Sequence, residues 1–141
     1  MTDTLASDFV QKINAINAST AASLLQQLYH TDVEFIYPVK HIHGRAHLIE
    51  YFEDIYKEVK SCSFELQAST IEDNKSSLEW EMKLRHNTLA PKREICLSGI
   101  SVLRYRHDLV YYQRDYYDLG AMVYEQIPIL GAIIRKIRGQ I

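Results

Sequence analysis

The 141-residue sequence contains little cysteine, proline or glycine and no long hydrophobic run. Its two cysteines, Cys62 and Cys96, lie far apart and outside any Cys-x-x-Cys spacing, so we expect two free thiols in a reducing compartment. Residues 1–8 include two acids and no apolar run, which argues against a signal peptide. The apolar segment 119–134 is interrupted by polar residues and is shorter than the ~20 residues of a membrane span. We therefore expect a cytoplasmic protein.

The sequence also lacks a large excess of charge of either sign, because the net charge is only -2. Such a chain has no general attraction for nucleic acid, so we expect no nucleic-acid partner. A hydrophobic content of 47% with 24% charged residues is ordinary for a globular protein. We find no internal repeat and no motif that implies a cofactor. The composition and length predict a single domain over residues 1–141 that folds without a disulfide or a metal.

Apolar spacing changes from helical to strand-like along the chain. Steps of three and four predict helices over residues 5–16, 20–28 and 46–59, with a short strand over 33–37 and a histidine-rich loop over 40–44. Alternation then predicts strands over residues 63–71, 77–87, 95–105 and 109–117. We expect a loop at Pro91, a tight turn at His107 and Asp108, and a helical tail that Pro128 breaks. This order predicts an α+β fold in which helices cover one face of a curved, mostly antiparallel sheet.

The segment 77–87 has the clearest alternation in the chain. Trp80, Met82 and Leu84 share one face with Leu78, whereas charged residues occupy the other face. We expect the apolar face to line the interior and to contribute to a ligand-binding pocket.

The segment 109–120 places Arg114 and Asp115 side by side in a tyrosine-rich strand, so the two charges must point to opposite faces. An inward Asp115 would lose solvation, its pKa should rise, and it could exchange a proton near neutral pH. A structural aspartate satisfied by hydroxyl or amide groups is the alternative. Arg114 shares its face of the strand with Tyr112 and Tyr116. Because arginine and tyrosine are enriched at protein interfaces, this pattern predicts a homodimer through the outer sheet surface.

Other side chains can contribute to the same pocket. Tyr37, Tyr111 and Tyr117 are candidate phenol partners of Asp115, and Ser101 on the neighbouring strand is a lesser one. His43 is a candidate at the pocket rim, although solvated loop histidines are the commoner case. His41, His43 and His47 have no carboxylate or cysteine at ligand spacing, so we expect no metal site.

The tail 127–141 carries an apolar stripe with Arg135, Lys136 and Arg138 outside it. A basic amphipathic helix can lie on a membrane. Packing on the protein's own domain, over the pocket mouth, is the commoner arrangement and the one that we expect.

Several motifs together resemble the nuclear transport factor 2-like superfamily and, within it, the SnoaL-like group of ketosteroid isomerases, polyketide cyclases and limonene-epoxide hydrolases. The matching residues are 28–35 (LYHTDVEF), Pro38, Gly44 with Arg45, and 114–118 (RDYYD). The resemblance covers nearly the whole chain. It implies a cone-shaped sheet wrapped on the N-terminal helices, an apolar pocket, and a dimer built by the outer face of the sheet.

The resemblance also assigns roles to individual positions. The position of the ketosteroid isomerase general base holds Tyr37, and that of its second acid holds Ser101. Asp115 matches one acid of the Asp-Arg-Asp set of the epoxide hydrolases. Three hypotheses stay open at this point: acid or base chemistry on a lipophilic substrate through Asp115, a non-catalytic carrier or sensor that uses the same pocket, and a dimeric interaction module.

Overall fold

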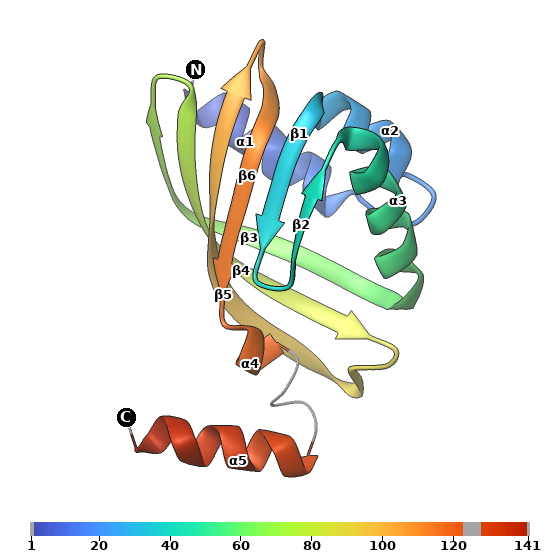
Figure 1. The fold of residues 1–141 in the computed structure, drawn as a ribbon, viewed down its shortest axis with the longest axis vertical. Helices are drawn as coiled ribbons and strands as arrows, with labels where there is room; N and C mark the ends of the chain where they lie inside the picture. The colour runs from blue at the N-terminus through green and yellow to red at the C-terminus, as the bar shows by residue number, and fades with distance from the viewer. Residues whose placement is uncertain (1, 123–127, 141) are drawn as a thin grey trace.

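A computed structural model describes residues 2–122 and 128–140. Its secondary structure confirms the α+β fold, with N-terminal helices packed on a curved sheet (Figure 1). The helices are α1 (Thr2–Asn14), α2 (Ala21–Leu28), α3 (Arg45–Ile55), the 3-10 helix η1 (Tyr56–Glu58), α4 (Leu119–Met122) and α5 (Pro128–Gly139). The strands are β1 (Tyr29–Tyr37), β2 (Lys40–His43), β3 (Val59–Glu72), β4 (Lys75–His86), β5 (Ala90–Arg106) and β6 (Leu109–Tyr117).

The strands form one six-stranded sheet in the order β2-β1-β6-β5-β4-β3. Among the described strands, only β1 and β6 pair in parallel, and this pairing brings the N-terminal half of the chain against β6. The expected tight turn at His107 and Asp108 joins β5 to β6, and both residues have positive φ, as a two-residue hairpin of the matching twist requires. The sheet is therefore mostly antiparallel, as the alternation predicted.

Helix α1 is fixed to the sheet at its C-terminal end. The Asn14 side chain donates to the Phe64 carbonyl at 2.9 Å and accepts from the Phe64 amide at 2.7 Å, so it completes the backbone pairing of β3. Phe9 of α1 and Phe52 of α3 are buried in the core together with the inward residues of the strands. The core therefore lies between the concave face of the sheet and these two helices.

Two expectations about loops are wrong. Residues 40–43 form β2 instead of a loop, and pair with β1 in a hairpin around Pro38 and Val39. Ile42 is the only buried residue of β2, so the strand leaves almost no apolar alternation in the sequence. Strand β5 begins at Ala90, so Pro91 lies within it. This end of β5 pairs with β4 alone, and an unpaired strand edge tolerates the missing N–H of proline.

The tail differs from expectation in two ways. Pro128 begins helix α5 and does not break it, in agreement with the preference of proline for the first helical turn. Ile133 and Ile137 are 52% and 54% exposed, so the expected packing of the apolar stripe on the domain is wrong for these residues. The same packing was expected of Ile129, Leu130 and Ile134, whose side chains lie outside the described part of the structure.

Both cysteines are free, as expected, with Cys62 partly buried and Cys96 exposed. Within residues 2–122 and 128–140, no helix is both long and apolar enough to cross a membrane.

A close approach in the sheet depends on Gly99. Gly99 of β5 pairs with Trp80 of β4, and the Trp80 indole lies directly on the glycine. A Cβ atom at residue 99 would stand 2.3 Å from the Trp80 ring and 2.8 Å from the Tyr116 carbonyl oxygen, which is closer than real Cβ contacts. Glycine at this position therefore sets the position of the indole.

We predict that Gly99→Ala lowers the free energy of unfolding by about 1–3 kcal/mol, because the added methyl group overpacks the strand and displaces the indole. Urea denaturation measures the change. Gly139→Ala is the matched control, since a Cβ at residue 139 meets no atom within 4 Å. Equal stability of the two variants would contradict this account of Gly99.

Candidate functional site

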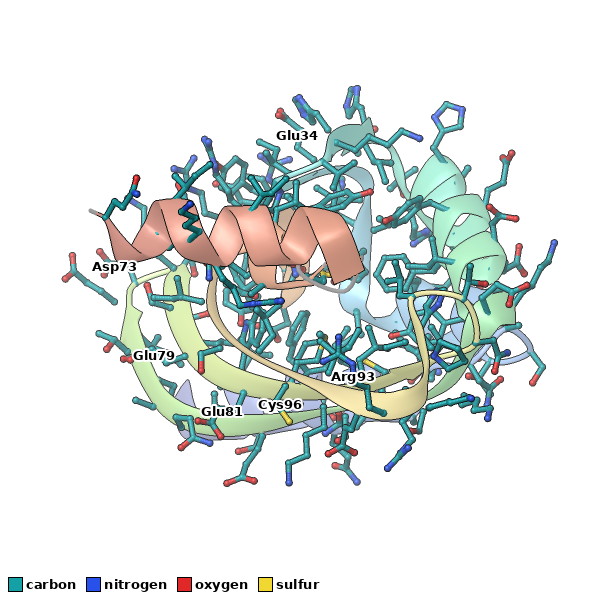
Figure 2. The ribbon with its side chains drawn as sticks, turned by 90° about the horizontal axis from the view of Figure 1, so that it is seen from below. Glu34, Asp73, Glu79, Glu81, Arg93 and Cys96 are labelled. Atoms are coloured by element: carbon teal, nitrogen blue, oxygen red, sulfur yellow. The ribbon has the colours of Figure 1, made fainter. Side chains whose placement is uncertain are left out.

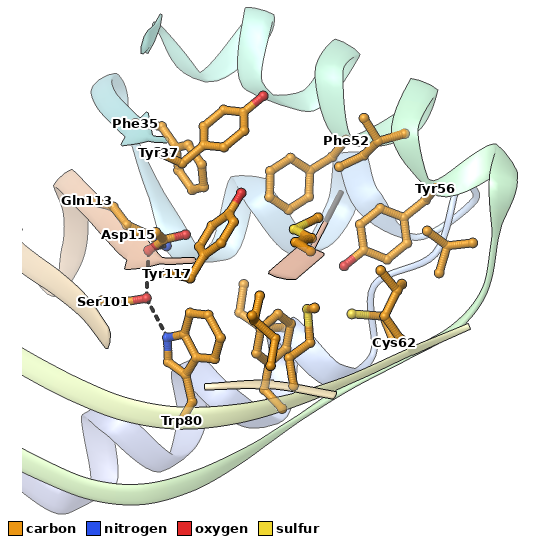
Figure 3. A pocket seen from close by; sticks show the side chains of 18 of the residues that line it. Phe35, Tyr37, Phe52, Tyr56, Cys62, Trp80, Ser101, Gln113, Asp115 and Tyr117 are labelled. Carbon is orange, nitrogen blue, oxygen red and sulfur yellow. Dashed lines mark hydrogen bonds between the residues drawn. The ribbon is translucent and has the colours of Figure 1, made fainter. Parts of the chain in front are cut away.

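A cavity of about 320 Å³ lies between the concave face of the sheet and helices α1 and α3. Its walls are mostly apolar and aromatic side chains from every strand except β2. The volume is at the lower end of the range of small-molecule sites. Figure 3 shows the polar end of the cavity, where Asp115 and Ser101 lie opposite Phe52 and Tyr56.

Asp115 is held in this cavity by its strand register. It pairs with Ser101 across β5 and β6, and its neighbours two residues away, Gln113 and Tyr117, also point inward. Ser101 Oγ donates to Asp115 Oδ1 at 2.6 Å, and Gln113 Nε2 donates to the same oxygen at 3.0 Å. The second carboxylate oxygen, Oδ2, is thus left for the cavity.

The two donors to Asp115 are themselves fixed. Trp80 Nε1 donates to Ser101 Oγ at 2.9 Å (Figure 3), and the Tyr29 hydroxyl donates to Gln113 Oε1 at 2.6 Å. Because an indole nitrogen can only donate, the Ser101 hydroxyl must turn its own hydrogen toward Asp115. The network therefore runs inward from Trp80 and from Tyr29 and ends on one carboxylate oxygen.

Burial raises the pKa of Asp115 to about 6, and the hydrogen bonds from Ser101 and Gln113 oppose this rise because they stabilise the ionised form. No lysine or arginine is among the residues that line the cavity in the described part of the chain. Asp115 is thus a partly buried carboxyl group that titrates near neutral pH without a cationic partner in the cavity. Such a group can accept a proton through Oδ2 and return it.

Tyrosine hydroxyls surround the same end of the cavity. Tyr37 donates to Tyr51 at 2.5 Å, and Tyr117 lies close enough to Asp115 for the carboxylate charge to raise its pKa, after the larger effect of burial. Burial also raises the pKa of Tyr37 and of Tyr51. These phenols stay protonated at neutral pH and can serve as hydrogen-bond donors or acceptors toward a ligand.

The opposite end of the cavity carries the polar side chains of Tyr56, Cys62 and His86. Tyr56 and Cys62 form a hydrogen bond with each other, and burial raises the pKa of the Cys62 thiol to about 11. A thiol with so high a pKa is a weak nucleophile. We therefore assign the pair a packing role in the apolar end of the cavity.

The structure brings together seven of the nine residues that the sequence singled out. Those that line the cavity are Tyr37, Trp80, Met82, Leu84, Ser101, Asp115 and Tyr117.

Tyr111 and His43 do not line the cavity. Arg104 pairs with Tyr112 but Tyr105 pairs with Val110, so Tyr111 is the extra residue of a β-bulge. The bulge turns Tyr111 outward, where its ring lies 4.3 Å from the guanidinium carbon of Arg106. His43 is exposed at the end of β2. Within the described residues, no three potential metal-ligating side chains gather around it or elsewhere.

Sequence reasoning missed Gln113, Tyr29 and Tyr51. Gln113 could have been found from alternation, because it shares the inward face of β6 with Asp115 and Tyr117. Tyr29 and Tyr51 come from β1 and α3, and only the tertiary fold brings them to the site.

Residues 7–113 match the model of the SnoaL-like domain. No curated protein matches the chain. Solved structures with a similar fold include a SnoaL-like protein from Shewanella denitrificans, provisionally named a polyketide cyclase, at 16% identity, with 85% of this chain and 92% of that chain covered and a TM-score of 0.71.

A hypothetical protein from Catenulispora acidiphila with a ketosteroid isomerase-like fold, solved in complex with trimethylamine, is 17% identical, with 84% and 90% of the two chains covered and a TM-score of 0.70. A second provisional SnoaL-like polyketide cyclase, from Jannaschia sp. CCS1, is 10% identical, with 84% and 89% covered and a TM-score of 0.68. At these identities, the likeness establishes the fold alone.

The raised pKa of Asp115 predicts a specific dependence of stability on pH. The folded chain holds the Asp115 proton more tightly than the unfolded chain, so this contribution is complete below pH 3.8 and is lost as the pH rises through about 6. Asp115→Asn keeps an acceptor oxygen for Ser101 and Gln113 but cannot ionise. Relative to the wild type, the free energy of unfolding of the variant should therefore rise by up to roughly 3 kcal/mol between acid and neutral pH.

Chemical denaturation across this pH range measures the difference, with Asp32→Asn at an exposed position as the control. A difference between wild type and Asp115→Asn that stays constant with pH would show that Asp115 is well solvated.

Proposed function

Because this chain belongs to the SnoaL-like domain family, we propose that its cavity binds a small lipophilic molecule and that Asp115 exchanges a proton with that molecule. The observation that carries the proposal is the free oxygen of Asp115. Oδ1 takes both hydrogen bonds, whereas Oδ2 accepts no hydrogen bond from the described residues and belongs to the lining of a mostly apolar cavity. A carboxylate oriented in this way is suited to act as a general base or, once protonated, as a general acid.

The surroundings of Asp115 favour a ligand with one polar group. The polar side chains at the Asp115 end are those of Ser101, Gln113, Tyr37, Tyr51 and Tyr117. The opposite wall is apolar apart from Tyr56, Cys62 and His86. A lipophilic body would bury apolar area against that wall, and its polar group would then meet Oδ2.

A non-catalytic carrier or sensor is the second candidate, and one observation favours it. The positions of the two ketosteroid isomerase acids hold Tyr37 and Ser101, and the Ser101 hydroxyl is already committed to Asp115. Asp115 is the only carboxyl group among the described residues that line the cavity. A single carboxylate can orient a ligand without transforming it.

The proposal predicts that the protein accelerates hydrogen–deuterium exchange at the acidic carbon of 2-tetralone, a compact bicyclic ketone. The C–H bond breaks, its proton passes to Oδ2, the electron pair forms the enolate, and a deuteron from the solvent restores the carbon. Proton NMR in deuterated buffer should show an acceleration of at least about a hundred-fold over buffer, the lower end of the usual range for a positioned general base. Asp115→Asn should remove most of it.

Quenching of Trp80, the single tryptophan, reports binding in the same samples. Binding without acceleration would favour the carrier, and undiminished exchange by Asp115→Asn would exclude the proposed role of Asp115.

We also propose a homodimer through the outer face of β5 and β6. Arg104 lies over the Tyr112 ring at 4.3 Å and Arg114 over the Tyr116 ring at 5.2 Å, while Tyr116 is 48% exposed. Arg104 Nε is buried without a hydrogen-bond partner within the described residues. Exposed arginine and tyrosine of this kind are enriched at protein interfaces.

Tyr116→Glu should weaken this dimer by at least about ten-fold, because it puts like charges opposite each other at a two-fold interface. Sedimentation velocity measures the association, and Glu50→Lys on the exposed side of α3 is the control. A wild-type monomer at high concentration, or a dimer that Tyr116→Glu leaves unchanged, would contradict the proposed interface.

A further inference from the structure

Exposed apolar side chains gather at one end of the molecule. Among the described residues, the large hydrophobic side chains with high exposure are Val39 at 60%, Ile133 at 52%, Ile137 at 54% and Tyr116 at 48%. Tyr116 belongs to the outer sheet face. Val39 lies in the turn between β1 and β2, which points toward the end of the molecule where α4 and α5 lie (Figure 1).

The cavity reaches the same end. Its lining includes Val39 from the β1–β2 turn, Leu89 from the connection between β4 and β5, and Leu119 and Met122 from α4. These segments border the cavity on the side that faces α5 (Figure 1). We call them the mouth segments.

Helix α5 combines apolar and basic side chains and contains no acid. Ile133 and Ile137 lie one turn apart on one face of the helix, and the exposed Lys136 flanks them. Arg138 and Arg135 are also exposed and lie further round the helix, with Arg135 on the opposite side. Arg138 forms an ion pair with Asp118, which joins the last turn of α5 to the residue that precedes α4. In the view from below, α5 crosses the near side of the molecule (Figure 2). The ion pair therefore keeps α5 beside the mouth segments.

We propose that α5 and the mouth segments bind the surface of a bilayer that contains anionic phospholipids. Ile133 and Ile137 enter the boundary between headgroups and acyl chains, and Lys136, at the edge of their face, meets the lipid phosphates. Arg135, on the opposite side of the helix, adds to the positive charge that attracts α5 to an anionic surface. The docking goes beyond the proposed function and does not require the proton chemistry of Asp115. If that function holds, a lipophilic ligand can pass between the bilayer and the cavity without crossing water.

The charge of α5 favours this occupant over a second copy of the chain. Two copies of α5 packed along their apolar stripes would bring basic residues of both helices together, and no acid of α5 would offset the repulsion. An anionic lipid surface supplies the opposite charge along the whole helix. Binding of this kind weakens with added salt, because salt screens the phosphates.

Co-sedimentation of the full chain with vesicles tests the proposal. The vesicles contain phosphatidylcholine alone or with about one third phosphatidylglycerol. We expect at least about five-fold more bound protein on the anionic vesicles, and a fall in binding at high salt. Ile133→Asp with Ile137→Asp, and separately Arg135→Glu with Lys136→Glu, should each reduce the binding by about five-fold or more. Ser23→Asp with Gln26→Asp, which adds two acids at exposed positions of α2, at the end of the molecule away from α5, should bind as the wild type does (Figure 1).

Circular dichroism verifies that each variant is folded. Absent binding, equal binding to both kinds of vesicle, or binding that survives the α5 substitutions would overturn the proposal. So would an α5 variant that turns a lipid-free dimer into a monomer while the wild type ignores vesicles, since α5 would then be a protein interface. Deuterium exchange of 2-tetralone in solution should be the same in the α5 variants and the wild type, so failure of the docking and failure of the proposed function are distinguishable.

Discussion

The site depends on one ionisable carboxyl group, Asp115, that is held in an apolar cavity by neutral donors. Ser101 and Gln113 both donate to Oδ1, and Trp80 and Tyr29 fix these two donors from the strands on either side. Hydrogen bonds to a charged group contribute about 1.5–3 kcal/mol each, which is enough to hold the side chain but not enough to cancel the loss of solvation. The carboxyl group therefore stays in place while its pKa rises to about 6.

The pairing register of β4, β5 and β6 places the side chains of this network next to one another. The pairing of Ser101 with Asp115 sets the short contact across β5 and β6, and the pairing of Trp80 with Gly99 leaves room for the indole to reach Ser101. Much of this was predictable from the sequence, because alternation in β4 and β6 assigns Trp80 and Asp115 to the inward faces. Alternation fails at Tyr111, where a bulge adds one residue, and a bulge leaves no periodic signal.

Other parts of the site and the fold could not be predicted locally. Tyr29 and Tyr51 reach the cavity from elements whose packing depends on the whole sheet. Strand β2 was missed because its four residues include a single buried side chain. The tail was predicted to be an amphipathic helix, and α5 is a helix, but the pattern of apolar residues does not say what covers them. The exposure of Ile133 and Ile137 and the basic residues beside them are the features that point to a lipid surface.

A carbon-13 NMR titration of the Asp115 side-chain carboxyl carbon tests the central claim most directly. The assigned signal should titrate with a midpoint near pH 6, because the group is poorly solvated, and replacement of Ser101 by alanine should move that midpoint upward by removal of a donor to the ionised form. A midpoint near the ordinary value of 3.8 would mean that water reaches the carboxylate freely, and would contradict the account of the cavity given above.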